Sequence, residues 1–197
     1  MRKRFCVNNY IASEIFSYYN VYMFSDPVKN VEQCGIQAGM EIADFGSGSG
    51  HYTIAGARAL MATGRVYAID IQKELLTKLK NATAKEGLYN VEVVWGDIEK
   101  LSGTKLRDSS VDFVFMCNIL FQVEDKLAVF KEAKRILKPG GRILVVEWVD
   151  SFGGIGPKPN LIVKKDFVSG VLEKEGFHLD KEISPGAHHY GLIYKKL

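Results

Sequence analysis

The stretch Asp44-Phe45-Gly46-Ser47-Gly48-Ser49-Gly50 follows directly on the apolar run 40–43, and apolar residues at helical spacing come after it. This order predicts a strand, a glycine-rich turn and a helix. Glycine permits positive φ angles and leaves no Cβ to keep a ligand away from the backbone. The unpaired N–H groups and partial positive charge at the start of a helix favour an anionic group. The stretch therefore indicates a turn that binds a nucleotide-like ligand.

The spacing of the glycines separates two kinds of nucleotide site. A dinucleotide-binding turn has glycine at its first, third and sixth positions. Counted from Gly46, the third position is Gly48, but the sixth is His51. An imidazole there stands where close packing of helix and strand favours glycine or alanine. The spacing disfavours a nicotinamide cofactor, which stays open as an alternative.

From about residue 41 the pattern alternates between strands and helices. The strands are short, β-branched and almost continuously apolar, which is typical of strands covered on both faces. Such alternation implies right-handed βαβ crossovers and a parallel sheet, hence an α/β fold. The predicted strands are 41–45, 65–70, 91–95, 111–117 and 141–148, and the predicted helices lie near 49–62, 72–86 and 124–138.

The regular alternation of strands and helices ends after residue 148. Residues 150–160 are rich in glycine and proline and predict a loop, which a helix near 164–175 follows. Two extended runs, 177–183 and 188–195, are joined across Ser-Pro-Gly at 184–186. This arrangement predicts that the chain ends in a β-hairpin.

The N-terminal segment has its own composition. We predict an aromatic-rich helical cap or lid over residues 1–30 and a single domain over 31–197. The segment either packs on the edge of the sheet or covers an acceptor pocket. Its aromatic residues are Phe5, Tyr10, Phe16, Tyr18, Tyr19, Tyr22 and Phe24.

Composition narrows the class of protein further. With 197 residues, 47% of them hydrophobic, the chain can form one domain with a substantial core. A net charge of only +3 does not by itself indicate nucleic-acid binding. The three cysteines lack metal-ligand spacing, so we expect neither disulfides nor a metal site. No apolar run has the length of a membrane span, and we expect a cytoplasmic protein.

Polar residues stand at the carboxyl ends of the predicted strands, where open α/β sheets bind their ligands. Any one of them can be explained as a helix cap or a turn residue. Their occurrence in order at one edge of the sheet indicates a shared site instead. They are Asp44, Asp70, Asp97 (with Ile98 beside it), Asn118 and Glu147.

These motifs resemble those of class I S-adenosylmethionine-dependent methyltransferases, from about Val31 to the C-terminus. The run Leu-Lys-Pro-Gly-Gly-Arg at 137–142, with Glu-Gly-Phe at 175–177, is similar to the subgroup containing ubiquinone/menaquinone biosynthesis and arsenite methyltransferases. The resemblance implies a Rossmann-like, doubly wound, seven-stranded sheet that is mostly parallel and has an antiparallel last strand.

The resemblance also implies S-adenosylmethionine as the cofactor and S-adenosylhomocysteine as the product. It places the glycine turn at the methionine part of the cofactor, the acid after the second strand at the ribose, and the residue after the fourth strand near the sulfonium. The residues implied in cofactor binding are Asp44, Gly46, Ser47 and Gly48 in the turn, Asp70 at the ribose, Ile71, Asp97 and Ile98 at the adenine, and Asn118 near the sulfonium and amino group.

A small molecule is the expected methyl acceptor, and several alternatives stay open. Asn118-Ile119-Leu120-Phe121 lacks the prolines of enzymes that methylate nucleobase amino groups. RNA or protein could still be contacted through the basic N-terminus and Lys164-Lys165. Arsenite chemistry would need thiolates brought together from Cys6, Cys34 and Cys117. A non-catalytic module that only binds S-adenosylmethionine is a further possibility.

A general base would help transfer to oxygen or carbon, and no metal or covalent intermediate is required. The candidates are His51, Glu147, His188 and His189. Neighbouring side chains on a strand point to opposite faces, so at most one of the adjacent histidines can face a site. The sequence does not single out a catalytic residue, and it leaves the oligomeric state open.

Overall fold

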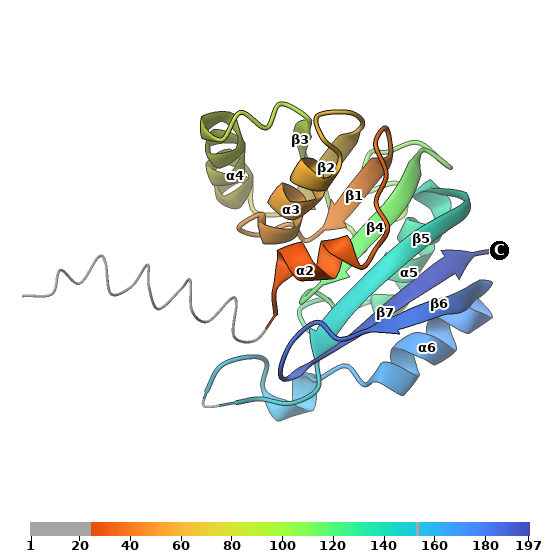
Figure 1. The fold of residues 1–197 in the computed structure, drawn as a ribbon. Coiled ribbons are helices and arrows are strands. Elements are labelled where there is room, and N and C mark those ends of the chain that lie inside the picture. The colour runs from red at the N-terminus through yellow and green to blue at the C-terminus, as the bar shows by residue number, and fades with distance from the viewer. Residues whose placement is uncertain (1–24, 153) are drawn as a thin grey trace, which may run out of the picture.

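A computed structural model describes residues 25–152 and 154–197. The predicted cap or lid of residues 1–30 falls largely outside this range, so it is described only from Ser25 onward. The described chain forms one seven-stranded sheet in the order β3-β2-β1-β4-β5-β7-β6 (Figure 1). The strands are β1 (Glu41–Phe45), β2 (Arg65–Asp70), β3 (Val91–Trp95), β4 (Val111–Cys117), β5 (Leu137–Trp148), β6 (Phe177–Ile183) and β7 (His189–Lys196).

Strand pairing gives the sheet its two-part topology. β1 pairs in parallel with β2 on one side and with β4 on the other, so the strand order reverses at the centre of the sheet. β7 runs antiparallel to both of its neighbours, β5 and β6. The predicted mostly parallel sheet with an antiparallel last strand is therefore confirmed. The switch between β1 and β4 opens a crevice at the carboxyl ends of these strands.

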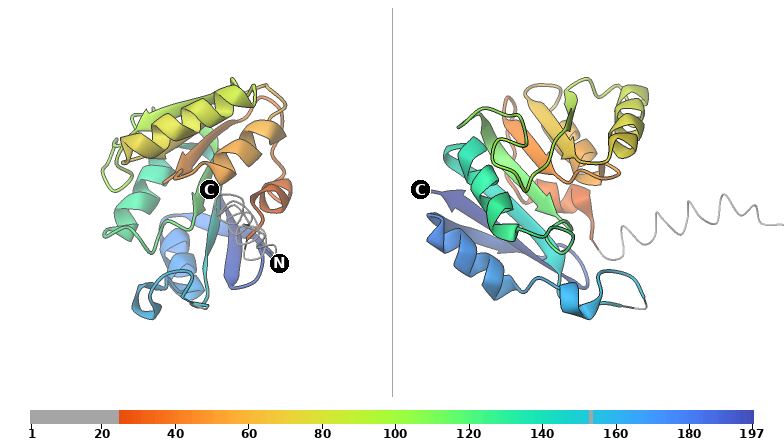
Figure 2. Two further views of the ribbon diagram at one scale, coloured as in Figure 1. Left: turned by 90° about the vertical axis from the view of Figure 1, so that its left-hand side faces the viewer. Right: turned by 180° about the vertical axis from the view of Figure 1, so that it is seen from behind.

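Helices cover both faces of the sheet (Figures 1 and 2). α2 and α3 lie over one face, and α5 and α6 lie over the other, while α4 packs against β2 and β3. Among the described residues no helix is long and apolar enough to cross a membrane. The bounds are α2 (Pro27–Glu32), α3 (His51–Ala59), α4 (Lys73–Lys85), α5 (Lys126–Ile136), α6 (Lys165–Lys174) and a 3₁₀ turn, η1 (Pro159–Leu161).

The central strand β4 is apolar at every position except Asp112, and its packing shows why. Phe113 and Phe115 belong to the core layer beneath α2 and α3, whereas Val114 and Met116 belong to the layer beneath α5 and α6. All four side chains are completely buried. Because alternate residues of a strand face opposite sides, a strand between two helical layers needs apolar residues on both of its faces.

Several element boundaries differ from the sequence prediction by a few residues, and two of these differences have a clear structural cause. α3 begins at His51 and not near 49, because Gly50 is still in the turn, with a φ of 87°. β5 begins at Leu137 and not at 141, because Leu137 already pairs with Val111 before the ladder shifts register and continues with Arg142 opposite Phe113. A Pro-Gly pair can be held within a strand where the ladder is irregular.

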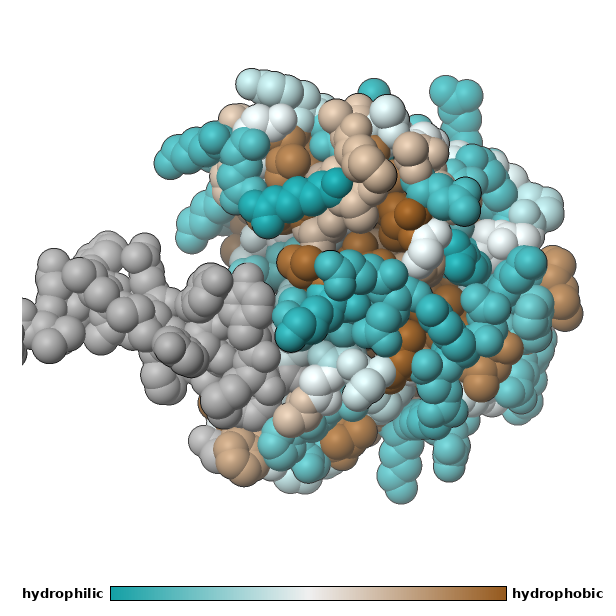
Figure 3. Space-filling view, in the orientation of Figure 1, coloured by the Kyte–Doolittle hydropathy of each residue, from teal (hydrophilic) through white to brown (hydrophobic). Residues whose placement is uncertain are grey.

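The short helix α2 packs against α3 and so attaches the start of the described chain to the rest of the domain. Asp26 caps it by accepting hydrogen bonds from the backbone N–H groups of Val28 and Lys29. The Asn30 side chain donates to the hydroxyl of Tyr52 in α3 at 2.8 Å. The face that carries α2 is otherwise mostly hydrophilic, with smaller apolar patches between the polar side chains (Figure 3).

Candidate cofactor and acceptor site

The glycine turn is fixed to the neighbouring strand by its backbone. The N–H groups of Gly46 and Ser47 donate to the carbonyl of Ile69 at 2.9 and 3.0 Å. Gly46 and Gly48 have φ angles of 67° and 52°, a region that side chains strongly disfavour. A Cβ on Gly46 would come within 2.4 Å of Ile119, whereas the nearest atom to a Cβ on Gly48 is 3.8 Å away. A Cβ on Gly48 would therefore meet the protein only in ordinary van der Waals contact, without a clash.

Asp44 lies beneath this turn at the end of β1 and is 3% exposed. Its carboxylate accepts a hydrogen bond from the Thr53 hydroxyl at 2.5 Å. Burial raises the pKa of the Asp44 carboxyl to about 6, and the bond from Thr53 opposes that rise. The carboxyl group thus sits in a largely dehydrated position directly below the turn.

Asp70, at the end of β2, braces the turn from the side. One carboxylate oxygen accepts from the N–H of Gly48 at 2.9 Å, and the other accepts from the N–H of Gln72 at 2.8 Å. A carboxylate oxygen has a second lone pair, so each can accept one more hydrogen bond. The acid that was predicted to contact a ribose therefore also shapes the backbone of the turn.

Asp97 and Ile98 lie where β3 runs into the following loop. The Asp97 carboxylate accepts from the N–H of Glu99 at 3.0 Å and pairs with Lys100 at 2.9 Å. The hydrogen bond from Lys100 lowers the pKa of the Asp97 carboxyl. Ile98 is buried, whereas the side chain of Ile71 is 64% exposed. An acid with apolar neighbours matches a site for a polar aromatic ring.

Asn118, which follows β4, adopts a φ of 56°, and its N–H donates to the carbonyl of Val146 at 2.8 Å. The next two N–H groups, of Ile119 and Leu120, donate to one carboxylate oxygen of Glu147 at 2.8 and 2.6 Å. Glu147 thereby holds the turn that presents Asn118. Burial raises the pKa of the Glu147 carboxyl to about 7.

Two cavities meet at the glycine turn. The first has a volume of about 380 Å³ and the second about 270 Å³. Both are lined by Gly46, Gly48 and Gln122, so they adjoin one another. Of the other residues predicted to bind the cofactor, the first cavity contains Asp44, Ser47 and Asn118, and the second contains Asp70, Ile71, Asp97 and Ile98.

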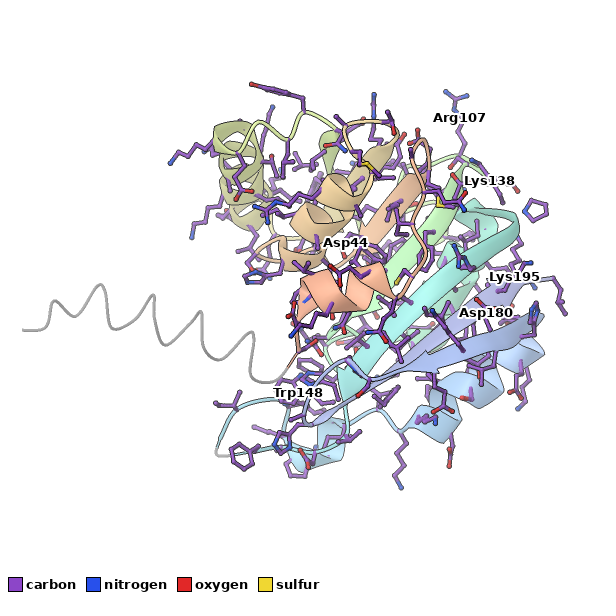
Figure 4. All side chains as sticks on the ribbon, viewed as in Figure 1. Asp44, Arg107, Lys138, Trp148, Asp180 and Lys195 are labelled. Carbon is purple, nitrogen blue, oxygen red and sulfur yellow. The ribbon has the colours of Figure 1, made fainter. Side chains whose placement is uncertain are left out.

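The first cavity continues beyond the turn toward β5. Trp148, Tyr52 and Ile155 add aromatic and apolar side chains to its walls. Asp44 and Trp148 lie toward the same edge of the sheet, away from Arg107 and Lys195 (Figure 4). The first, partly aromatic cavity thus lies where β1, β4 and β5 end, and the second cavity, which Asp70 and Asp97 line, lies where β1, β2 and β3 end.

Comparison with known proteins identifies the family. A family model described as a methyltransferase domain matches residues 36–175. The chain belongs to this methyltransferase family. It is 36% identical over 117 residues to a demethylmenaquinone methyltransferase of Staphylococcus aureus, an alignment covering 59% of this chain and 46% of that protein. The methyltransferase therefore spans about half the length of the curated relatives it matches.

Solved structures agree with this assignment. A SAM-dependent methyltransferase from Aquifex aeolicus superposes with a TM-score of 0.81 at 28% identity, covering 94% of this chain and 98% of that one. A putative type 11 methyltransferase from Sulfolobus solfataricus gives a TM-score of 0.63 at 28% identity, with coverages of 85% and 89%. The predicted class I S-adenosylmethionine-dependent methyltransferase, its fold and its cofactor are confirmed.

The residues of the methyltransferase fit this cofactor. Ser47 Oγ and Asn118 Oδ1 are buried and have no hydrogen-bond partner within the described residues, and both residues line the first cavity. Buried polar atoms of this kind normally have a partner, which the polar end of a ligand can supply. Gly48 leaves the backbone accessible between the two cavities. An elongated ligand with an amino-acid end and a nucleoside end matches this arrangement.

Some lining residues of the methyltransferase were not predicted. Gln122 borders both cavities, and its side chain donates to the carbonyl of Asn118 at 2.9 Å. Its position four residues after Asn118 was the available signal. No sequence signal pointed to Tyr52 or Ile155 as lining residues. Tyr52 lies in α3, and Ile155 lies in a loop far along the chain.

The four candidate bases of the methyltransferase differ in whether they line a cavity. His51 and His189 line the first cavity, whereas His188 and Glu147 line neither. His188 pairs with Asp150 at 2.6 Å and stacks on Phe152. Only one of the adjacent histidines faces the cavity.

Proposed function

We propose that this methyltransferase transfers a methyl group from S-adenosylmethionine to a small-molecule acceptor that binds in the first cavity. The observation that supports this most directly is the continuation of that cavity past Asn118 to the aromatic side chains of Trp148 and Tyr52. Its volume of about 380 Å³ lies in the range of small-molecule sites.

The two adjoining cavities suggest how the donor is divided between them. The nucleoside end would lie in the second cavity, with Asp70 at the ribose hydroxyls and Ile71 and Ile98 against the adenine. The amino-acid end would lie in the first cavity, beside Ser47 and Asn118. The turn at Gly48 would then lie against the middle of the cofactor, where a side chain on residue 48 would obstruct binding.

The cofactor supplies a methyl group on a positively charged sulfur, which is a good leaving group. The protein's contribution is then to position the acceptor in line with that methyl group and to exclude water. Trp148 and Tyr52 provide aromatic faces in the same cavity, and such faces attract cations. The buried Glu147 keeps the turn of Asn118 in place through two backbone hydrogen bonds.

The name of the Staphylococcus relatives supports a flat ring as the acceptor, because those proteins are demethylmenaquinone methyltransferases. The aromatic wall of the first cavity suits such a ring, since aromatic groups pack favourably by offset or edge contacts. A flat quinone-like or aromatic ring is accordingly the acceptor class that we propose.

The other acceptors find less support. Lys165 forms an ion pair with Glu182 at 2.6 Å, which partly offsets its positive charge toward RNA. For thiol-based arsenic chemistry, burial raises the pKa of the Cys34 thiol to about 12, and burial also raises that of Cys117. Neither thiol favours the thiolate form that soft metal ligation needs. Cys6 lies outside the described residues.

Transfer of label from methyl-labelled S-adenosylmethionine to cell extract tests the proposal. The extract is separated into small-molecule, RNA and protein pools after incubation with the full chain. We expect label in the small-molecule pool, and we expect Asp70→Ala to abolish most of it while the surface variant Asp166→Asn does not. Label in the RNA or protein pool would contradict the proposed acceptor. Cofactor binding without transfer to any pool would indicate a non-catalytic module.

A further inference from the structure

We infer that the Tyr52 hydroxyl group donates a hydrogen bond to an oxygen atom on the acceptor, and that the first cavity thereby selects a ring that carries a carbonyl group. The inference rests on the proposed function. Tyr52 is the second residue of α3, and it lines the first cavity together with Ser25. Both residues are buried. A phenol therefore gives this cavity a polar group in addition to an aromatic face.

The Tyr52 hydroxyl belongs to a polar trio that also contains the side chains of Ser25 and Asn30. The amide nitrogen of Asn30 donates to the Tyr52 oxygen at 2.8 Å and to Ser25 Oγ at 3.0 Å, and the two hydroxyl oxygens are 3.1 Å apart. The same nitrogen donates to the carbonyl of Pro185 at 3.4 Å. A carbonyl oxygen only accepts, so the amide must turn its nitrogen toward this position.

The polar trio cannot use all of its own protons. The amide nitrogen of Asn30 only donates, because its lone pair is delocalised into the amide group. One hydroxyl proton can lie between the Ser25 and Tyr52 oxygens. The other has no acceptor left inside the trio, so one of the two hydroxyl groups must donate to something outside it.

The surroundings indicate that the outward proton belongs to Tyr52. Within the described residues the Ser25 hydroxyl has no further hydrogen-bond partner, whereas the Tyr52 hydroxyl also interacts with the Cys117 thiol. A buried donor without an acceptor costs free energy. Ser25 therefore donates to Tyr52, and Tyr52 directs its own proton toward Cys117, which lines the first cavity.

The thiol of Cys117 leaves this donor incompletely satisfied, because the sulfur of a thiol is a weak acceptor. A carbonyl oxygen that enters the first cavity is a better partner for the same proton. Burial raises the pKa of the Tyr52 hydroxyl well above its ordinary value, so the group keeps its proton in neutral solution. Tyr52 can therefore donate to a ligand without a change of charge.

Contacts at both ends of Tyr52 hold its hydroxyl in place. The phenol ring packs against Phe115 with centroids 6.2 Å apart and an angle of 61° between the planes. Asn30 holds the oxygen from α2, and Pro185, in the connection between β6 and β7, holds Asn30. A site with a fixed hydrogen-bond donor rejects a ligand of the same shape that lacks the matching group, because the donor then stays poorly paired.

Two ring ligands of nearly the same shape test this selectivity. Dimethylnaphthoquinone, methylated at both free carbons of its quinone ring, carries two carbonyl groups, and the corresponding dimethylnaphthalene carries none. The methyl groups block the carbons at which a quinone would otherwise react with a thiol such as that of Cys117. Equilibrium dialysis of the full chain with S-adenosylhomocysteine bound gives a Kd for each ligand. The difference in their hydrophobicity cancels when the ratio of the two Kd values is compared between proteins.

Tyr52→Phe should raise the Kd of the quinone relative to that of the hydrocarbon by roughly tenfold, as expected for one lost hydrogen bond. The variant Ser25→Ala/Tyr52→Phe should show the same loss, which excludes a replacement donor from Ser25. Tyr190→Phe is the matched control, because it removes a buried hydroxyl that donates to Val163 at 3.0 Å and lines neither cavity. Its ratio should stay within about twofold of the wild-type ratio.

A second measurement needs no variant. The two carbonyl groups of this quinone are equivalent in solution, and a donor at one of them makes them differ in the bound state. We expect two carbonyl bands in the infrared spectrum of the quinone bound to the wild-type protein. Thermal unfolding and calorimetric binding of S-adenosylhomocysteine establish that each variant used in the dialysis is folded.

Three outcomes would overturn the inference. A wild-type ratio in both Tyr52 variants would show that the hydroxyl does not contact the ring. An equal loss of affinity for both ligands would show that Tyr52 is only structural. A single carbonyl band would exclude a donor at one end. Label transfer tests the proposed function separately: without transfer by the wild-type protein both fail, whereas an active wild type with an unchanged ratio in the variants removes the inference alone.

Discussion

Asp70 and Gly48 are joined by a hydrogen bond in which the carboxylate of Asp70 accepts from the backbone N–H of Gly48 at 2.9 Å. The acid at the end of one strand thus supports the turn at the end of the next strand in the sheet. Because Asp70 also lines the second cavity, the geometry of the turn and the recognition of a nucleoside depend on the same side chain.

The first prediction concerns this acid. Asp70→Ala should weaken S-adenosylhomocysteine binding by roughly 1–3 kcal/mol, as expected when charge-assisted hydrogen bonds are removed. Asp70→Asn should lose less, since its amide oxygen can still accept from the N–H of Gly48. Titration calorimetry measures both, with Asp166→Asn as the control. Unchanged affinity in the alanine variant would remove the ribose assignment.

A second prediction separates two glycines of the turn. Gly46→Ala should lower the free energy of unfolding by more than 2 kcal/mol, roughly, because a methyl group would overlap Ile119 and the φ angle is left-handed. The methyl group of Gly48→Ala would meet no clash, so this variant should cost only about 1–2 kcal/mol for its φ angle.

The effects of the two variants on cofactor binding should not follow their effects on stability. The added methyl group of Gly48→Ala points into the space where the ligand would lie, so its affinity loss should exceed what its stability loss suggests. Urea denaturation and calorimetry on the same preparations give both quantities. A Gly48→Ala protein with wild-type affinity would show that the ligand does not approach this backbone.

The third prediction concerns the attachment of α2. The Tyr52 hydroxyl accepts from the Asn30 side chain at 2.8 Å and lies 3.1 Å from the hydroxyl of Ser25. Tyr52→Phe removes the shared partner and should cost about 1–3 kcal/mol of stability. Asn30→Ala should cost a similar amount, and the double variant should cost less than the sum, because the two residues act through one contact. Additive losses in urea denaturation would contradict this coupling.

The fourth prediction is a pH dependence of stability. Burial raises the pKa of the Glu147 carboxyl from 4.5 to about 7, and burial raises that of Asp44 from 3.8 to about 6. At a pH between the unfolded and the folded pKa of each carboxyl group, the folded protein keeps a proton that the unfolded chain has lost. The free energy of unfolding must therefore fall as the pH rises from about 4 to 7.

Glu147→Gln should flatten much of this slope, because the amide oxygen still accepts from Ile119 and Leu120 but cannot ionise. The difference between the two proteins should change by on the order of 3 kcal/mol between pH 4.5 and 8. Urea denaturation in a series of buffers measures it, with Glu74→Gln on the exposed start of α4 as the control. A Glu147→Gln protein with the wild-type slope would show that this carboxyl is not the source.

The sequence predicted the sheet because each strand had a local signature. β4 is apolar at every position except Asp112, since both of its faces are covered, and turns bound it on each side. The polar residues at the strand ends could also be predicted, because parallel strands bring their carboxyl ends to one edge. Every residue implied in cofactor binding lines one of the two cavities.

Other features depend on contacts that no local pattern encodes. β5 begins at Leu137 because Val111 offers it a partner, which requires the neighbouring strand to be in place. Tyr52 lines the first cavity from the start of α3, and Ile155 lines it from a glycine-rich loop. Strand periodicity allowed at most one of His188 and His189 to face the site. The pairing of β7 with β5, which sets His189 opposite Trp148, decides that it is His189.

The two cavities draw on different parts of the chain. Every residue that lines the second cavity lies between Gly46 and Val123, whereas the first cavity also takes Trp148, Ile155 and His189 from the later part. Substitutions after β5 can therefore reshape the surroundings of the acceptor while the nucleoside compartment stays intact. A chain built in this way can acquire a new acceptor during evolution without having to rebuild its capacity to bind the methyl donor.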